Sequence, residues 1–202
     1  MKRIFLLLSV FLFAAAGCYA DCILNSTEFY RAYLDVPLVN SAHQNKNNFT
    51  AEHKAYLMNE NNPMDIRMAI VNAFDWDHEG DYYRPFMDYL KEKTNSRSDE
   101  EVIQNASAER LVTLAYLKAM QELDVEEDED IPTLLDMALQ KPHDLTVSYL
   151  LPHIIIMTQI LDFDGQRDKI FPMVERGILS NPNQDMRPEA IDYYMDYMNY
   201  YR

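Results

Sequence analysis

Glycine, cysteine and tryptophan are scarce in this chain, and the first two shortages each exclude a kind of structure. Only 4 of 202 residues are Gly, too few for the glycine-rich loops that hold phosphate groups. The 2 Cys, Cys18 and Cys22, lie close together near the start of the chain, so no framework of disulfides holds the body together. A hydrophobic core must therefore stabilise the fold.

Positive charge is also in short supply. The chain has 18 Lys and Arg against 33 Asp and Glu, a formal net charge of −15. Phosphate backbones and anionic membrane surfaces would be repelled, so we expect no nucleic-acid partner. A basic protein partner or a cation remains compatible with this charge. Because 48% of the residues are hydrophobic, the body is expected to fold.

Residues 1–20 have the pattern of a secretory signal peptide. Lys2 and Arg3 precede an apolar run, Ile4–Phe13, and small residues follow. The run is too short to span a membrane, which takes about 20 residues. Removing this segment leaves 16 basic residues against 33 acidic ones, a charge near −17.

The residues Ala-Ala-Gly-Cys at 15–18 resemble a bacterial lipobox. The resemblance implies that Cys18 is lipidated and anchors the chain in the periplasm or at the outer membrane. Ala15 departs from the family pattern, which prefers Leu at this position. The alternative is ordinary cleavage after Ala16 or Ala20, which would release a periplasmic or secreted protein.

Apolar residues at helical spacing predict helices through most of the remaining chain. We divide it into an N-terminal helix with a polar loop at 21–49 and a helical domain at 50–202. The Asn-rich stretch Val36–Phe49 is interpreted as the loop. Thr50 and Ser98 are expected to cap the helices that follow them. The helices are expected at 26–34, 52–58, 64–74, 86–92, from 98, 108–123, from 131, 145–161, 169–179 and 187–201.

The segment Ile131–Gly165 indicates two antiparallel helices that turn at Lys141-Pro142, and a similar unit follows it. Pro132 and Pro172 are 40 residues apart, as are Pro142 and Pro182. This period, with Ile131-Pro132-x-x-Leu135 and Asp65-Ile66-Arg67, resembles HEAT or armadillo repeats. The resemblance implies an all-α fold in which antiparallel helix pairs stack as a short right-handed α-solenoid. The alternative is an irregular helical bundle.

Acidic pairs occur at three junctions between the expected helix pairs. A stack of repeats would line them along one edge, where carboxylates could bind a basic protein or calcium. The alternative is that they solubilise turns and favour the positive N-terminus of the next helix. The candidate partner-binding residues are Asp75 with Asp77, Asp124 with Glu126, and Asp162 with Asp164.

The last helix carries two apolar stripes. The first, expected to pack inward, contains Ile191, Tyr194, Met195, Met198 and Tyr201. The second contains Tyr193, Tyr197 and Tyr200, and would face solvent at the end of the repeat. Tyrosine is favoured at interfaces, so we predict a docking face for a partner or for a second copy of this chain. The alternative is that the rings lie flat on the surface.

No HExxH or GxSxG motif is present, and we expect neither a cofactor nor catalysis. We predict an exported, non-catalytic helical-repeat module that binds another protein, as an immunity-type or scaffold protein of the bacterial envelope would. The alternative is a carbohydrate-active or hydrolytic protein in which Trp76 and the tyrosines stack on sugars. A calcium-dependent structural module is a third hypothesis.

Overall fold

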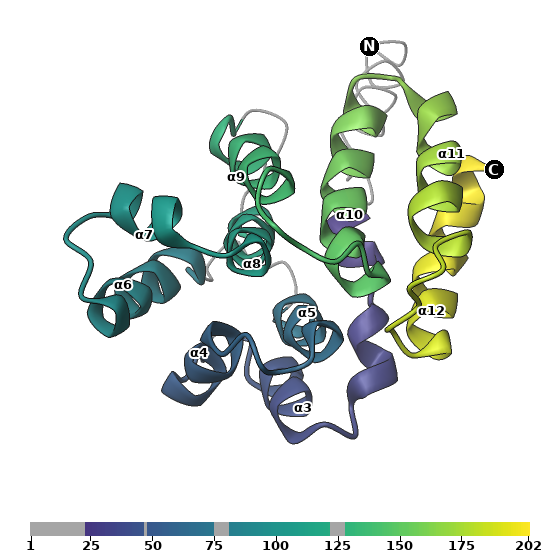
Figure 1. Ribbon diagram of the computed structural model, residues 1–202. Coiled ribbons are helices and arrows are strands. Elements are labelled where there is room, and N and C mark those ends of the chain that lie inside the picture. The colour runs from purple at the N-terminus through teal and green to yellow at the C-terminus, as the bar shows by residue number, and fades with distance from the viewer. Residues whose placement is uncertain (1–22, 47, 75–80, 122–127) are drawn as a thin grey trace, which may run out of the picture.

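The computed structural model describes residues 23–46, 48–74, 81–121 and 128–202, and every regular element in these ranges is helical (Figure 1). The predicted all-α class is therefore confirmed. None of the helices in the described ranges is long and apolar enough to cross a membrane. The predicted signal peptide and Cys18 lie outside the described residues.

In the described residues of the N-terminal half, eight helical elements largely follow the predicted helices. They are α2 (Ile23–Ser26), the 3₁₀ turn η1 (Phe29–Tyr33), α3 (Pro37–Gln44), α4 (Ala51–Met58), α5 (Met64–Ala73), α6 (Tyr83–Thr94), α7 (Asp99–Asn105) and α8 (Ala108–Ala119).

The C-terminal half ends in a helix that runs almost to the last residue. Its elements are α9 (Asp130–Leu139), α10 (Val147–Phe163), η2 (Arg167–Lys169), α11 (Ile170–Val174), the π-helical turn η3 (Glu175–Leu179), α12 (Pro188–Met198) and η4 (Asn199–Tyr201).

The two predicted helix caps are present. The Thr50 hydroxyl accepts a hydrogen bond from the His53 amide at 3.2 Å, and Ser98 accepts one from the Glu101 amide at 3.3 Å. Each bond satisfies an amide that has no partner inside its own helix. These hydroxyls therefore fix where α4 and α7 begin.

The prediction of a polar loop at 36–49 is wrong, because this stretch contains the two-turn helix α3. Pro37 occupies the first helical position, where its missing N–H costs nothing. Val39 and Ala42, one turn apart, are fully buried, and α3 packs against α5. The many Asn residues made the stretch look like a loop, but two apolar residues at helical spacing were enough to dock it.

Three helices, α5, α8 and α10, form the centre of the molecule, and each contacts the other two. In α8 the nine residues from Leu111 to Ala119 are all buried, and in α5 the seven residues from Arg67 to Ala73 are buried. A helix that is buried on all sides lies inside a core rather than on a surface. The remaining helices surround these three (Figure 1).

The helix pairing differs from the one predicted for Ile131–Gly165. This segment does form α9 and α10, but α9 packs mainly against α8, and α10 contacts α11 and η3. The last pair differs too, since α12 packs against η1 rather than against α11. Sequence periodicity identifies apolar faces but does not say which faces meet. Contact between α5 and α10 also gives the body a shared core, a feature of the alternative bundle.

The N-terminal segment closes against the C-terminal helix. Phe29, Tyr30 and Tyr33 of η1 are buried. Arg187, just before α12, donates from its backbone amide to the Tyr33 hydroxyl at 3.0 Å and forms an ion pair with Asp35 at 2.5 Å. The two ends of the described chain therefore share one core.

Two acidic residues that follow the predicted pair Asp124 and Glu126 in the sequence have a structural role. The Lys118 side chain, on the buried helix α8, donates to Asp128 at 3.0 Å and to Asp130 at 2.6 Å. Burial disfavours the Lys118 ammonium, but these two carboxylates still raise its pKa above the ordinary value. The described part of this acidic stretch thus neutralises a buried cation.

We expect the double substitution Asp128→Asn with Asp130→Asn to lower the free energy of unfolding by about 1–3 kcal/mol. It would leave the mostly buried Lys118 ammonium without a carboxylate partner. Urea denaturation measures the change, and Asp136→Asn, at an exposed position of α9, is the control. Equal stability of the double variant and the control would contradict this role.

Candidate binding groove

An apolar groove of about 770 Å³ opens on the C-terminal helices, between the start of α10 and the α11–η3 segment. Leu145, Leu150 and Ile154 line one wall, and Pro172 and Met173 line the other. Leu145 is 50% exposed, a high value for a leucine inside a concave surface. The size and the apolar lining are those of a ligand or peptide site.

The groove owes part of its shape to Gly177, in the π-helical turn η3. A Cβ atom on this residue would lie 2.4 Å from Cδ1 of Ile154, closer than two carbon atoms approach. Only glycine lets η3 pack so closely on α10 while Ile154 keeps its present position. π-Helical turns occur frequently at functional sites.

The loop that ends the groove is held in place by hydrogen bonds. The Asn181 side-chain amide donates to the carbonyl of Leu145 at 3.1 Å and to that of Gly177 at 3.2 Å. The backbone of Val147 also donates to the carbonyl of Asn183 at 3.1 Å. A binding surface fixed in this way loses little conformational entropy when a ligand docks.

The groove rim is more basic than the rest of the molecule. Lys169 and Arg176 line it together with one carboxylate, that of Asp168, and all three residues are exposed. The whole chain carries −15, so this excess of cations is local. It favours a ligand with apolar groups and a negative charge next to them.

None of the residues predicted to bind a partner lines this groove. Asp75, Asp77, Asp124 and Glu126 lie outside the described residues. Asp162 forms an ion pair with Arg167, and Asp164 accepts a hydrogen bond from the Gln166 side chain at 3.3 Å. The sequence offered no motif for the groove, whose walls come from several segments between Leu145 and Asn183.

The expected inner stripe of α12 packs inward, since Tyr194 and Met198 are fully buried and Ile191, Met195 and Tyr201 are partly buried. In the outer stripe Tyr193 is 42% exposed, Tyr200 is 84% exposed, and Tyr197 is half-buried.

The structure brings one predicted acidic residue close to this outer stripe. Burial, Tyr197 and Asp162 together raise the pKa of the Tyr201 hydroxyl, and the Tyr197 and Tyr201 ring centroids are 6.2 Å apart. Asp162 and Tyr197 thus lie near the same tyrosine, although they were predicted as parts of separate surfaces.

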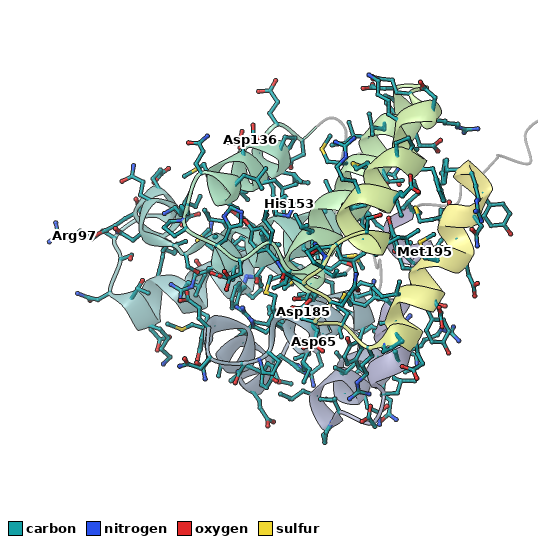
Figure 2. The ribbon with its side chains drawn as sticks, turned by 45° about the vertical axis from the view of Figure 1, so that its right-hand side comes forward. Asp65, Arg97, Asp136, His153, Asp185 and Met195 are labelled. Carbon is teal, nitrogen blue, oxygen red and sulfur yellow. The ribbon has the colours of Figure 1, made fainter. Side chains whose placement is uncertain are left out.

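A pair of carboxylates, Asp65 partly buried and Asp185 exposed, bears on the hydrolytic alternative. Figure 2 shows Asp65 and Asp185 close together, and burial, followed by the charge of Asp185, raises the pKa of Asp65. Both groups have structural bonds: Asp185 accepts from the Ser148 amide at 2.8 Å, and Asp65 accepts from the Ile66 amide at 2.8 Å. Each therefore bonds to an amide in the first turn of a helix.

In the described part of the chain, no group of three or more His, Cys, Asp or Glu side chains could hold a metal ion. His153, which the view in Figure 2 places in the interior, is 7% exposed, and burial lowers its pKa. Its Nδ1 atom lies 3.2 Å from the carbonyl of Tyr149.

Comparison with known proteins gives no relative. No family model, no curated protein and no solved structure matches this chain. The fold and the groove define a class only: an all-helical protein with a preformed apolar groove near its C-terminus.

Proposed function

We propose that this chain is an exported, non-catalytic helical module that binds another protein through its C-terminal groove. The observation that carries the proposal is the apolar groove itself, with Leu145 half exposed inside it. Exposed apolar side chains in a concave site are typical of surfaces that another molecule covers.

The charges on the rim support one chemistry for the partner segment. Lys169 and Arg176 flank the apolar walls, so the segment that fits carries apolar side chains with a carboxylate beside them. An amphipathic helix with an acidic edge has this composition. Two predicted contacts lie outside the groove: the acidic junctions, predicted to bind a basic partner, and the docking face formed by Tyr193, Tyr197 and Tyr200. The same partner or a second copy of this chain would make them separately.

The proposal includes a stacked-repeat arrangement, but its helix pairs differ from those predicted from the sequence. The pairs α6–α7, α8–α9 and α10–α11 each contain helices in contact, and α8 contacts both α6 and α10. A solenoid has these neighbour relations. The end of such a stack is where α10, α11 and η3 build the groove.

Export is supported by the sequence alone. The basic start, the short apolar run and the small residues before Cys18 favour a secreted or lipid-anchored protein. In the periplasm or outside the cell, an immunity-type or scaffold protein would meet its partner directly.

Site-specific photocrosslinking tests the groove. A photoreactive amino acid at Leu150, inside the groove, should crosslink one protein in cells that produce this chain. The same amino acid at the exposed Arg97, at the far end of the molecule (Figure 2), should not. Met173→Glu, which places a charge on the apolar wall, should abolish the Leu150 product. Equal products from both positions, or none at Leu150, would refute groove binding.

Gly177→Ala should narrow the groove while leaving the fold intact. The new methyl group must push Cδ1 of Ile154 away, and Ile154 lines the groove, so part of the binding volume is filled. Helix propensity favours alanine over glycine by about 1 kcal/mol, which offsets the local strain. We expect the thermal midpoint to change by only a few degrees and the Leu150 crosslink to weaken. A full-strength crosslink would contradict this role of Gly177.

A further inference from the structure

A second, polar pocket of about 470 Å³ lies where α8 begins. Glu60, Ser107, Arg110 and Lys141 line it, from three separate segments of the chain. The first turn of the 12-residue helix α8 follows Ser107, and its free amides carry partial positive charge. None of these residues lines the apolar groove.

A carboxylate of the protein itself occupies part of this pocket. The Ser107 hydroxyl donates to Oε1 of Glu60 at 2.7 Å, and Nη2 of Arg110 pairs with the same oxygen at 2.6 Å. The Glu60 side chain is 41% exposed and lies in the loop between α4 and α5, where it can swing outward. The position of its carboxylate shows that a carboxylate can accept hydrogen bonds from these donors.

A buried arginine next to the pocket has unused hydrogen-bond donors. Arg67 is 2% exposed, and among the described residues neither its Nε nor its Nη1 has a hydrogen-bond partner. The charges that act on its guanidinium are first Glu109, then Glu60 and Arg110, and the last two line the pocket. Nε of Arg110 is also without a partner in the described chain.

A buried donor without a hydrogen-bond partner lowers the stability of the fold unless a ligand or a water molecule accepts a bond from it. A buried guanidinium without a paired anion loses its hydration and gains little in return. Buried polar groups of this kind commonly mark the place of a bound ion or water. Arg110 and Lys141 line the pocket, and Arg67 lies close enough to interact with the charges of Glu60 and Arg110. These three cations outnumber the two nearby carboxylates, those of Glu60 and Glu109.

We propose that this pocket binds a small oxyanion, a carboxylate or a phosphate, which displaces the Glu60 side chain. The anion accepts hydrogen bonds from Ser107, Arg110 and the first amides of α8, and Arg67 supplies positive charge behind them. Arg67 is thus a positioning residue for the anion. The proposal does not depend on the apolar groove.

The test uses the amide NMR signals of Ser107, Ala108 and Glu109 in the full chain. Sodium phosphate and sodium acetate are titrated separately against sodium chloride at matched ionic strength. We expect saturable shifts in the wild type and at least tenfold tighter binding in Glu60→Ala, which removes the competing carboxylate. Whichever of the two anions binds more tightly identifies the ligand as phosphate or carboxylate.

Two further variants separate an anion site from a merely structural arginine. Arg67→Met should raise the thermal midpoint, because it removes an unpaired buried charge, and should weaken anion binding at least tenfold. Arg110→Gln, at a partly exposed position, should also weaken binding. The proposal is overturned if Glu60→Ala shows no saturable shift with either anion, or if both variants bind the anion as tightly as the wild type.

Discussion

Replacing Asn72 with alanine is expected to lower the free energy of unfolding by about 2–6 kcal/mol. Asn72 is 3% exposed. Its Oδ1 accepts from the backbone amide of Tyr30 at 3.0 Å, and its Nδ2 donates to the hydroxyl of Tyr116 at 3.0 Å. Alanine would remove a hydrogen bond from each of these two buried partners, at about 1–3 kcal/mol each. A domain is stable by about 5–15 kcal/mol in total, so this loss is large.

The effect is measured by urea denaturation of the full chain. Tyr116→Phe is the matched control, because it removes one hydroxyl from the same chain of hydrogen bonds and leaves the Tyr30 amide paired with Asn72. It should cost only about 1–3 kcal/mol. A loss below about 1 kcal/mol for Asn72→Ala would mean that this side chain does not link η1, α5 and α8.

Tyr33→Ala should cost about 3–5 kcal/mol, the usual range for removing a buried aromatic ring. The Tyr33 ring is fully buried, and the Arg187 guanidinium lies 4.6 Å from its centroid. Its hydroxyl accepts from the Arg187 amide at 3.0 Å. The substitution therefore removes the ring that joins the N-terminal segment to the start of α12.

Tyr33→Phe separates the hydroxyl from the ring, and should cost only about 1–2 kcal/mol. Hydrogen exchange gives a second readout, because the amides of α12 should lose protection in Tyr33→Ala before those of α8. If α12 stays as protected as in the wild type, the N-terminal segment does not hold that helix. The same result would favour treating 50–202 as a separate domain, the division made from the sequence.

Local signals in the sequence predicted local structure well. Thr50 and Ser98 cap helices because a hydroxyl before an apolar run satisfies free amides, whatever lies elsewhere in the chain. The inner stripe of α12 was found in the same way, since Tyr194 and Met198 share a face one turn apart. Both inferences needed only the spacing of nearby residues.

Long-range partners were harder to predict. Nothing near Asn72 says that it joins Tyr30 to Tyr116, because the three residues meet only when α5, α8 and η1 pack. The same applies to α9, which was predicted to pair with α10 but packs mainly against α8. Nothing in the sequence singles out Lys118, and its burial beside Asp128 and Asp130 is visible only in three dimensions.

The groove could not be predicted because it is a shape rather than a motif. Its floor depends on Gly177, where a missing side chain lets Ile154 fill the space beneath η3. Its end depends on the Asn181 amide holding the loop against Leu145. Glycine and asparagine are common wherever a chain turns, so neither residue pointed to a binding site.

The most direct test of groove binding is the affinity of the partner, once crosslinking from Leu150 has identified it. Binding is titrated with the purified wild type, with Gly177→Ala, and with Gly165→Ala as the control. Gly165 has a positive φ of 71° and open space around its Cβ position, so alanine strains the backbone there without filling the groove. We predict at least tenfold weaker binding for Gly177→Ala and unchanged binding for Gly165→Ala. Equal affinity for all three proteins would contradict binding in the groove.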